Sequence, residues 1–190
     1  MNYQVFPLLF TRITTLLLFF LALGLSFIGI SSLLSFYIVV GVVFPLIISM
    51  RLHRLNETGA ALTLTENSQW MTYIHGFPAQ EQRSVLKNPC FFSEPRLRQF
   101  FIASFSGKLC LQIACLAILA HEAANQANTI VVLLVLMILL VYISKSIWIL
   151  FRLITGKWLC ESLATDSGSV WFQGFLGEGS KKVAMFTLLC

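Results

Sequence analysis

The stretch ITTLLLFFLALGLSFIGISSLLSFYIVVGVVFPLIISM, residues Ile13–Met50, contains no charged residue. As one helix it would be about 57 Å long at 1.5 Å per residue, nearly twice the thickness of the hydrocarbon core of a bilayer. We therefore expect it to fold back on itself. The predicted break is Ser31-Ser32, just after Gly29, which leaves Ile13–Ile30 and Leu33–Met50 as two membrane spans.

A cleaved signal peptide is the alternative for the first span, because Ala22 and Gly24 are small enough to form a cleavage site. The hydrophobic stretch begins only after Arg12, however, and it stays apolar from Gly24 as far as Met50. A retained membrane hairpin is therefore favoured. Pro45 is expected to kink the second span without ending it, as membrane helices tolerate.

The composition of the whole chain agrees with a membrane location. The chain has 190 residues, of which 57% are hydrophobic and 11% are charged, whereas soluble domains carry about 25% charged residues. The net charge is +5, but the basic residues lie beside apolar segments rather than on one polar face. Nucleic acid is therefore not an expected partner.

Two further apolar segments follow in the second half of the chain. Pro95 suits the first turn of a helix, and the segment Phe100–Ala120 is interrupted only by Lys108. A polar break lies at residues 121–128, and Thr129–Phe151 then continues with Lys145 as its one charged interruption. These segments are the predicted third and fourth spans.

The distribution of basic residues predicts the orientation of the spans. The two turns, Ser31-Ser32 and His121–Asn128, contain no Lys or Arg, whereas the terminal segments and the central loop hold or adjoin all 13. The positive-inside rule then places both termini and the loop in the cytoplasm. We expect a multi-pass protein of a bacterial inner (plasma) membrane.

The predicted fold is an all-α integral membrane protein with four transmembrane helices arranged as two hairpins. Residues 1–50 form the first hairpin, residues 51–98 a cytoplasmic loop, residues 99–151 the second hairpin, and residues 152–190 a cytoplasmic tail. Short helices are expected in the loop and in the tail.

Aromatic and aliphatic residues in the central loop indicate an amphipathic helix over residues 64–77. Trp70, Tyr73, Ile74 and Phe77 recur at i, i+3, i+4 and i+7, which places them on one helical face. Such a face beside a bilayer favours an interfacial helix; the alternative is that it packs against the protein's own loop or helix ends. Residues 79–87 are expected to form a second short helix.

The tail alternates aromatic islands with Gly, Ser and charged residues. A segment with this aromatic content is not expected to be freely solvated. It is expected to dock on the loop, on the membrane face or on a partner protein.

The sequence offers no catalytic, metal or nucleotide motif. The five cysteines include no C-x-x-C pair, and the three histidines lack a second ligand at helical spacing. His121-Glu122 is expected to be a solvated helix end. We therefore expect no cofactor, no metal site and no enzymatic activity.

Lys108 and Lys145 are the charged residues within the predicted spans, and both lie about 20–24 Å from the external helix ends. Snorkelling of these lysines to the cytoplasmic headgroups is the simpler interpretation. The functional hypothesis is that they hold an anionic lipid or a partner carboxylate between the third and fourth helices.

The favoured function is a small, non-catalytic membrane subunit that binds other membrane proteins, with a secretion, envelope or defence assembly as the candidates. No Asp or Glu lies within the spans, which disfavours an ion-coupled transporter. The alternative is a self-assembling, homo-oligomeric channel or membrane effector, with a pore lined by Ser, Thr, Gln and Lys.

Overall fold

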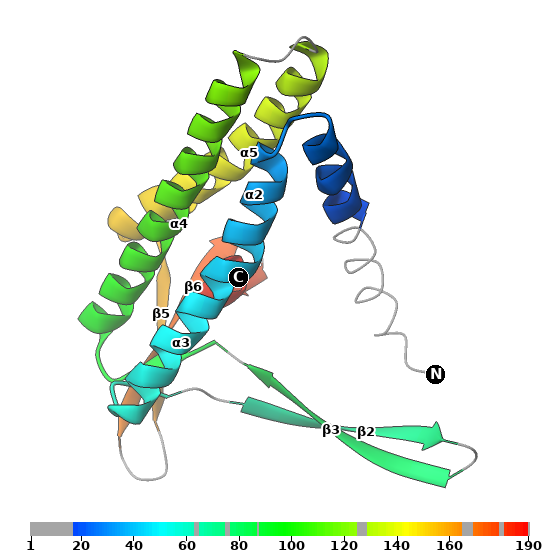
Figure 1. Cartoon of the computed structure of the whole chain (residues 1–190). Helices are drawn as coiled ribbons and strands as arrows, with labels where there is room; N and C mark the ends of the chain where they lie inside the picture. The colour runs from blue at the N-terminus through cyan, green and yellow to red at the C-terminus, as the bar shows by residue number, and fades with distance from the viewer. Residues whose placement is uncertain are drawn as a thin grey trace. The chain divides into compact units, whose positions relative to one another are not determined.

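The computed structural model describes residues 17–62, 65–74, 77–86, 88–124, 129–164, 169–178 and 181–189 (Figure 1). The described chain forms two compact units. The membrane unit contains the chain up to Leu46 together with Phe105–Leu150, and the sheet unit contains Ile47–Ser104 with the chain from Phe151 onwards.

Among the residues that the structure describes, three helices are long and apolar enough to cross a membrane: Ser32–Glu57, α4 (Glu94–Ala123) and α5 (Thr129–Ile154). The chain is thus mostly helical and has helices that could span a membrane, as predicted. The described part of the first predicted span is helical over Leu17–Phe27, which is shorter than the about 20 residues that a crossing needs. Residues 13–16 lie outside the described residues, so the fourth crossing stays a prediction.

The first reversal of the chain lies where the sequence predicts it. The N-terminal helix ends at Phe27, and the next helix, α2 (Ser32–Ile38), begins five residues later. Gly29 has a φ of 95°, and the Ile30 N–H donates to the Leu25 carbonyl at 3.0 Å. This 6→1 hydrogen bond around a left-handed glycine is a Schellman motif, which satisfies carbonyls at the helix end.

Pro45 lies within a continuous helix, as predicted, and a wide turn precedes it. Between α2 and α3 (Phe44–Glu57), residues Val39–Val43 form a π-helical segment, η1, in which the Phe44 N–H donates to the Val39 carbonyl. A proline has no N–H to donate, and its ring crowds the carbonyl four residues earlier. The π turn accommodates both effects without breaking the helix.

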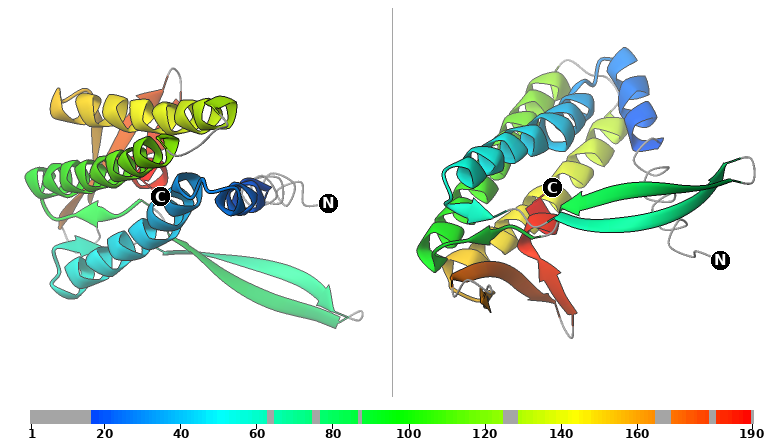
Figure 2. Two further views of the ribbon diagram at one scale, coloured as in Figure 1. Left: turned by 45° about the horizontal axis from the view of Figure 1, so that its top comes forward. Right: turned by 90° about the horizontal axis from the view of Figure 1, so that it is seen from below.

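The membrane unit has a small apolar core and an apolar exterior. Phe27 and Ile130 are 86% and 75% exposed, which suits a surface solvated by lipid chains rather than by water. Figure 2 gives two further views of these helices. The core residues are Ala22, Ile30, Leu33, Leu119, Val135 and Leu139.

The sheet unit overturns the prediction of an all-α fold. Its five-stranded antiparallel sheet has the order β1-β4-β6-β5, and β7 also pairs with β6. A short helix, α6 (Met185–Leu189), follows β7. The strands are β1 (Ala61–Leu62), β4 (Cys90–Phe91), β5 (Leu159–Ala164), β6 (Val170–Glu178) and β7 (Lys181–Ala184).

Strands β1 and β4 of this sheet come from the central loop, whereas β5, β6 and β7 come from the tail. In the register of β4 and β6, Phe91 lies opposite Phe172. Of the three docking places expected for the tail, the loop is therefore the one found. The loop and the tail belong to one folded unit.

The two helices predicted over residues 64–77 and 79–87 are wrong, because this part of the loop is a β-hairpin. Strand β2 (Thr65–Ile74) pairs with β3 (Phe77–Leu86) from Thr65↔Leu86 to Ile74↔Phe77. The strands include Thr72, Trp70, Tyr73 and Ile74, residue types that favour strands, and a short connection that contains Gly76 suits a tight hairpin. The aromatic spacing matched a helical period by coincidence.

Candidate functional site

The junction between loop and tail is held by buried hydrogen bonds from two amide side chains. Asn88 Nδ2 donates to the Gly174 carbonyl at 2.7 Å. Gln173 Nε2 lies 3.0 Å from the Asn88 carbonyl and 2.9 Å from Cys90 Sγ. Because both amides are buried, removing either one leaves polar groups of the other segment without a partner. The amides therefore specify the pairing of loop and tail.

Cys90 is part of this junction, and its thiol is a weak nucleophile. Its side chain is buried. Burial raises the pKa of the Cys90 thiol above its ordinary value, and the hydrogen bond from Gln173 offsets this only in part. Since the thiolate is the nucleophile, a buried and protonated thiol is a poor one. Cys90 is therefore a buried packing contact of the junction.

The inner face of the sheet packs on the beginning of α4. At Gly174, an added Cβ would lie 3.0 Å from Met185 Sδ, 3.4 Å from Leu97 Cδ2 and 3.6 Å from Phe101 Cε2. The absence of a side chain therefore lets β6 approach α4 and α6 closely. Phe91 joins this core, with its ring centroid 5.1 Å from that of Phe100.

The outer face of the sheet carries an apolar row, which we call the outer row: Phe92 and Leu163, which are exposed, and Trp171, which is half-buried. Leu163 lies opposite Trp171 in the register of β5 and β6, and the Phe92 and Trp171 rings meet edge to face at 6.2 Å. Phe92 is 62% exposed and Leu163 41%. Exposed apolar clusters of this kind are typical of protein contacts.

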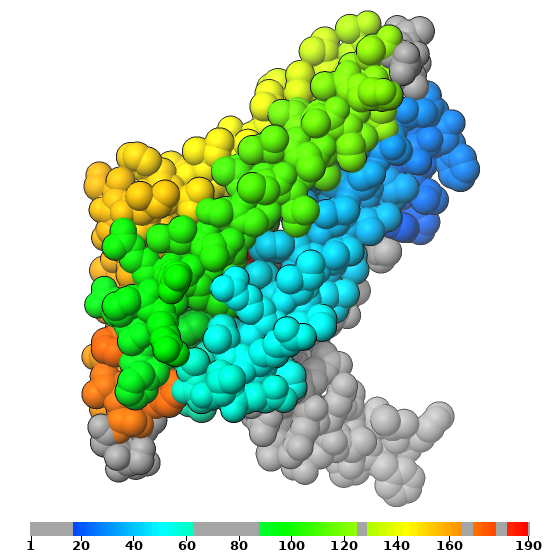
Figure 3. Space-filling model, turned by 60° about the vertical axis from the view of Figure 1, so that its left-hand side comes forward, coloured from blue at the N-terminus to red at the C-terminus, as the bar shows by residue number. Residues whose placement is uncertain are grey.

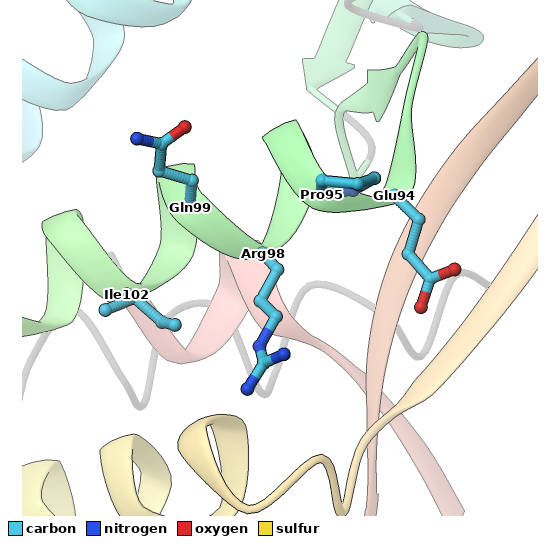
Figure 4. Close-up of a pocket in the computed structure, with 5 residues that line it drawn as sticks. All are labelled: Glu94, Pro95, Arg98, Gln99 and Ile102. Atoms are coloured by element: carbon cyan, nitrogen blue, oxygen red, sulfur yellow. The ribbon is translucent and has the colours of Figure 1, made fainter.

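A hollow of about 340 Å³ lies along the first turns of α4, lined by Glu94, Pro95, Arg98, Gln99 and Ile102. In Figure 4, Arg98 and Gln99 extend from different sides of the helix. Arg98 Nη2 donates to the Ile154 carbonyl at 2.8 Å. Its positive charge therefore lies at the C-terminal end of α5, where cations stabilise the helix.

Lys108 and Lys145, the two lysines of the predicted spans, lie on α4 and α5. Lys108 is half-buried, and its Nζ lies 6.0 Å from the centroid of the Phe44 ring of α3. Lys145 is exposed on α5. Phe44 belongs to the second predicted span. A lipid or carboxylate between the third and fourth helices stays a prediction.

The other candidate contact residues, Trp70, Tyr73, Ile74 and Phe77, lie on the hairpin β2–β3. Trp70 pairs with Glu81, Tyr73 with Pro78, and Ile74 with Phe77 through the backbone. Their side chains lie outside the described part of the structure. A strand repeats every two residues, so the single helical face predicted for them does not form, and their contact with lipid or a partner stays a prediction.

Glu122, expected to be a solvated helix end, instead links the two turns of the membrane unit. It accepts hydrogen bonds from the Ser31 N–H at 2.8 Å, from Ser31 Oγ at 2.5 Å and from the Ser32 N–H at 3.1 Å. These backbone groups lie at the N-terminal end of α2, where a carboxylate is favourable. The sequence shows a carboxylate in one turn and two serines in the other, but nothing in the sequence indicates that they contact each other.

The tail residues of the junction had a usable signal in the sequence. The run Val170–Leu176 is rich in aromatic and branched residues, which is typical of a strand. Its partner β4 has only two residues, too few for any periodicity. Within the described residues, no group of three or more His, Cys, Asp or Glu side chains is placed to hold a metal ion.

No known protein family, curated protein or solved structure matches this chain. Its function is therefore inferred from the residues and the geometry alone.

Proposed function

We propose that the protein is a small, non-catalytic subunit of a bacterial inner-membrane complex. It crosses the membrane four times with both termini in the cytoplasm, and it binds a partner protein through its sheet unit. The observation that carries this proposal is the outer row, a partly exposed aromatic and aliphatic surface on a folded unit built from the loop and the tail.

The chemistry of the outer row supports contact with a protein. Trp and other aromatic residues are enriched in the energetically important part of protein interfaces. Trp171 Nε1 donates to Ser169 Oγ at 3.1 Å, so the ring is held in place before a partner arrives. A held ring loses less side-chain entropy on binding.

The edge of the sheet adds a second contact surface. Strand β5 is the last strand in the sheet order, and five of its six residues are exposed. An edge strand presents unpaired backbone groups that a partner strand can join. Leu163 belongs to both the edge strand and the outer row.

The proposal is tested by purifying the full-length protein from its membrane in a mild detergent and measuring the mass and composition of the particle. We expect a partner protein in fixed stoichiometry. Phe92→Ser and Leu163→Ser should release it, whereas Val170→Ser should not. Val170 is a matched control, because it is 45% exposed on the same sheet but alternates with Trp171 to the opposite face.

A particle that contains only copies of this chain and conducts ions in planar bilayers would overturn the proposal in favour of a channel. Two of the polar residues in the spans are buried, whereas Lys145 is exposed. Gln112 and Ser146 are 1% and 5% exposed, so they are not available to line a pore formed between chains.

A further inference from the structure

We propose that a second hollow in the sheet unit, between α3 and α4, binds the phosphate headgroup of an anionic phospholipid through Arg51 and Arg96. This hollow has a volume of about 350 Å³ and is lined by Arg51, Leu55, Ala60, Phe91, Arg96, Gln99 and Phe100. Figure 3 shows the face on which α3, in cyan, lies beside the start of α4, in green. We call it the arginine hollow.

The lining combines a buried apolar floor with a cationic rim. Phe91, Phe100 and Ala60 are buried, whereas Arg51, Arg96 and Gln99 are exposed. The Arg51 guanidinium carbon lies 5.3 Å from the centroid of the Phe100 ring, a cation–π distance that holds the side chain over the floor. The volume lies at the lower end of the range for small-molecule sites, about 300–1,000 Å³.

The charge of the rim identifies the chemical class of ligand. Among the residues that the structure describes, neither Arg51 nor Arg96 forms an ion pair with a carboxylate. The described residues that line the hollow include no Asp or Glu. Guanidinium groups bind phosphate oxygens through two parallel hydrogen bonds, and Gln99 offers a further amide donor. An anion with several oxygen acceptors fits this set.

The position of the two arginines along the chain points to a lipid as the source of the phosphate. Arg51 directly follows the charge-free stretch that ends at Met50, and Arg96 lies four residues before the apolar segment that begins at Phe100. Both are therefore at the depth of the headgroups if α3 and α4 cross the bilayer. Basic pockets between helices on the cytoplasmic side are suited to anionic headgroups.

The inference rests on the proposed membrane location and orientation, but it does not require a partner protein. It also differs from the lipid site expected at Lys108 and Lys145, since neither lysine lines the arginine hollow.

The test is native mass spectrometry of the purified full-length protein, titrated with phosphatidylglycerol, with phosphatidylcholine of the same acyl chains, and with inorganic phosphate. We expect phosphatidylglycerol to bind more tightly than phosphatidylcholine. Arg51→Gln and Arg96→Gln should each weaken phosphatidylglycerol binding about 10-fold, because each removes charge-assisted hydrogen bonds.

Arg54→Gln is the matched control, because Arg54 lies on the same helix and is exposed but does not line the hollow. It should change the affinity by less than about 2-fold. Arg51→Lys and Arg96→Lys should restore part of the affinity, since they keep the charge and lose the two-pronged geometry. This rescue separates ligand binding from a general effect on folding.

Equal binding by all three glutamine variants, or equal binding of the two lipids by the unsubstituted protein, would overturn the inference. Tight, saturable binding of inorganic phosphate that displaces phosphatidylglycerol would support the phosphate site and assign it to a free phosphate. Loss of a protein partner in Arg51→Gln and Arg96→Gln with unchanged lipid binding would assign the hollow to an acidic peptide and overturn the lipid. Lipid binding without any partner protein would contradict only the proposed function.

Discussion

Glu122 is the residue that links the two turns of the membrane unit, through three hydrogen bonds to Ser31 and Ser32. Replacing an N-terminal helix cap by alanine costs about 1–2 kcal/mol. We expect Glu122→Ala to lower the thermal unfolding midpoint of the detergent-solubilised protein, because two N–H groups at the start of α2 lose their acceptor.

Glu57→Ala is the control for this substitution. Glu57 pairs with His53 at 3.4 Å, and both side chains are largely exposed, so the pair contributes little to stability. Equal unfolding midpoints for the two variants would show that the Glu122 contacts do not stabilise the membrane unit.

Cys160 provides a pH-dependent test of the sheet unit at the residue scale. Burial and, secondarily, the negative charge of Glu94 raise the pKa of the Cys160 thiol. Glu94→Gln removes that charge, so the pKa should fall and more thiolate should be present at a given pH. The rate of maleimide labelling, followed by peptide mass spectrometry between pH 7 and 10, should therefore shift towards lower pH.

In the same experiment Cys90 should stay unlabelled until the protein unfolds, because its thiol is buried and its pKa is raised by that burial. A labelling profile of Cys160 that does not move in Glu94→Gln would contradict the proximity of the two groups. Rapid labelling of Cys90 in the folded protein would contradict the buried junction.

Strand β6 is the element on which the sheet unit depends, since it pairs with β4, β5 and β7. We expect Gly174→Val to destabilise the protein by about 1–3 kcal/mol through overpacking. A Cβ at this position already meets Met185 Sδ at 3.0 Å. The loss is measured as a lower thermal unfolding midpoint in detergent.

The matched variant is Gly177→Val on the same strand. There an added Cβ meets nothing nearer than Leu159 Cδ1 at 3.8 Å, and valine favours strands. It should leave the unfolding midpoint nearly unchanged. If both variants unfold at the same temperature, the close approach of β6 to α4 and α6 is not a stability determinant.

The helices and the strands differ in how well they could be predicted. The long apolar segments were found because a bilayer demands about 20 consecutive apolar residues, a signal that needs no tertiary contact. The sequence of the hairpin β2–β3 predicts helices wrongly, because its aromatic residues are spaced at a 3.6-residue period although the same residue types also favour strands. For short segments, periodicity does not separate the two.

At the scale of the whole molecule, the orientation has a direct test in right-side-out spheroplasts with a membrane-impermeant maleimide. A cysteine introduced at Ala124, exposed just after the end of α4, should be labelled from outside. Cys160, exposed in β5, should be labelled only after permeabilisation, because the proposed positive-inside topology puts the sheet unit in the cytoplasm.

The structure guides the choice of these positions. Ser32 is fully buried and Cys90 is 1% exposed, so a failure to label either one would report burial rather than sidedness. Labelling of Cys160 in sealed spheroplasts would overturn the orientation and, with it, the depth assigned to the arginine hollow.

Membrane character, the place of the first reversal and the expected orientation follow from local composition, since lipid solvation and topology depend on runs of apolar and basic residues. The pairing of loop and tail does not follow from local composition. Phe91 and Phe172 are neighbours in the sheet although 80 residues separate them along the chain, and the arginine hollow joins residues of α3 and α4. These contacts form because buried polar groups and apolar faces of distant segments satisfy one another, a condition that no local pattern records.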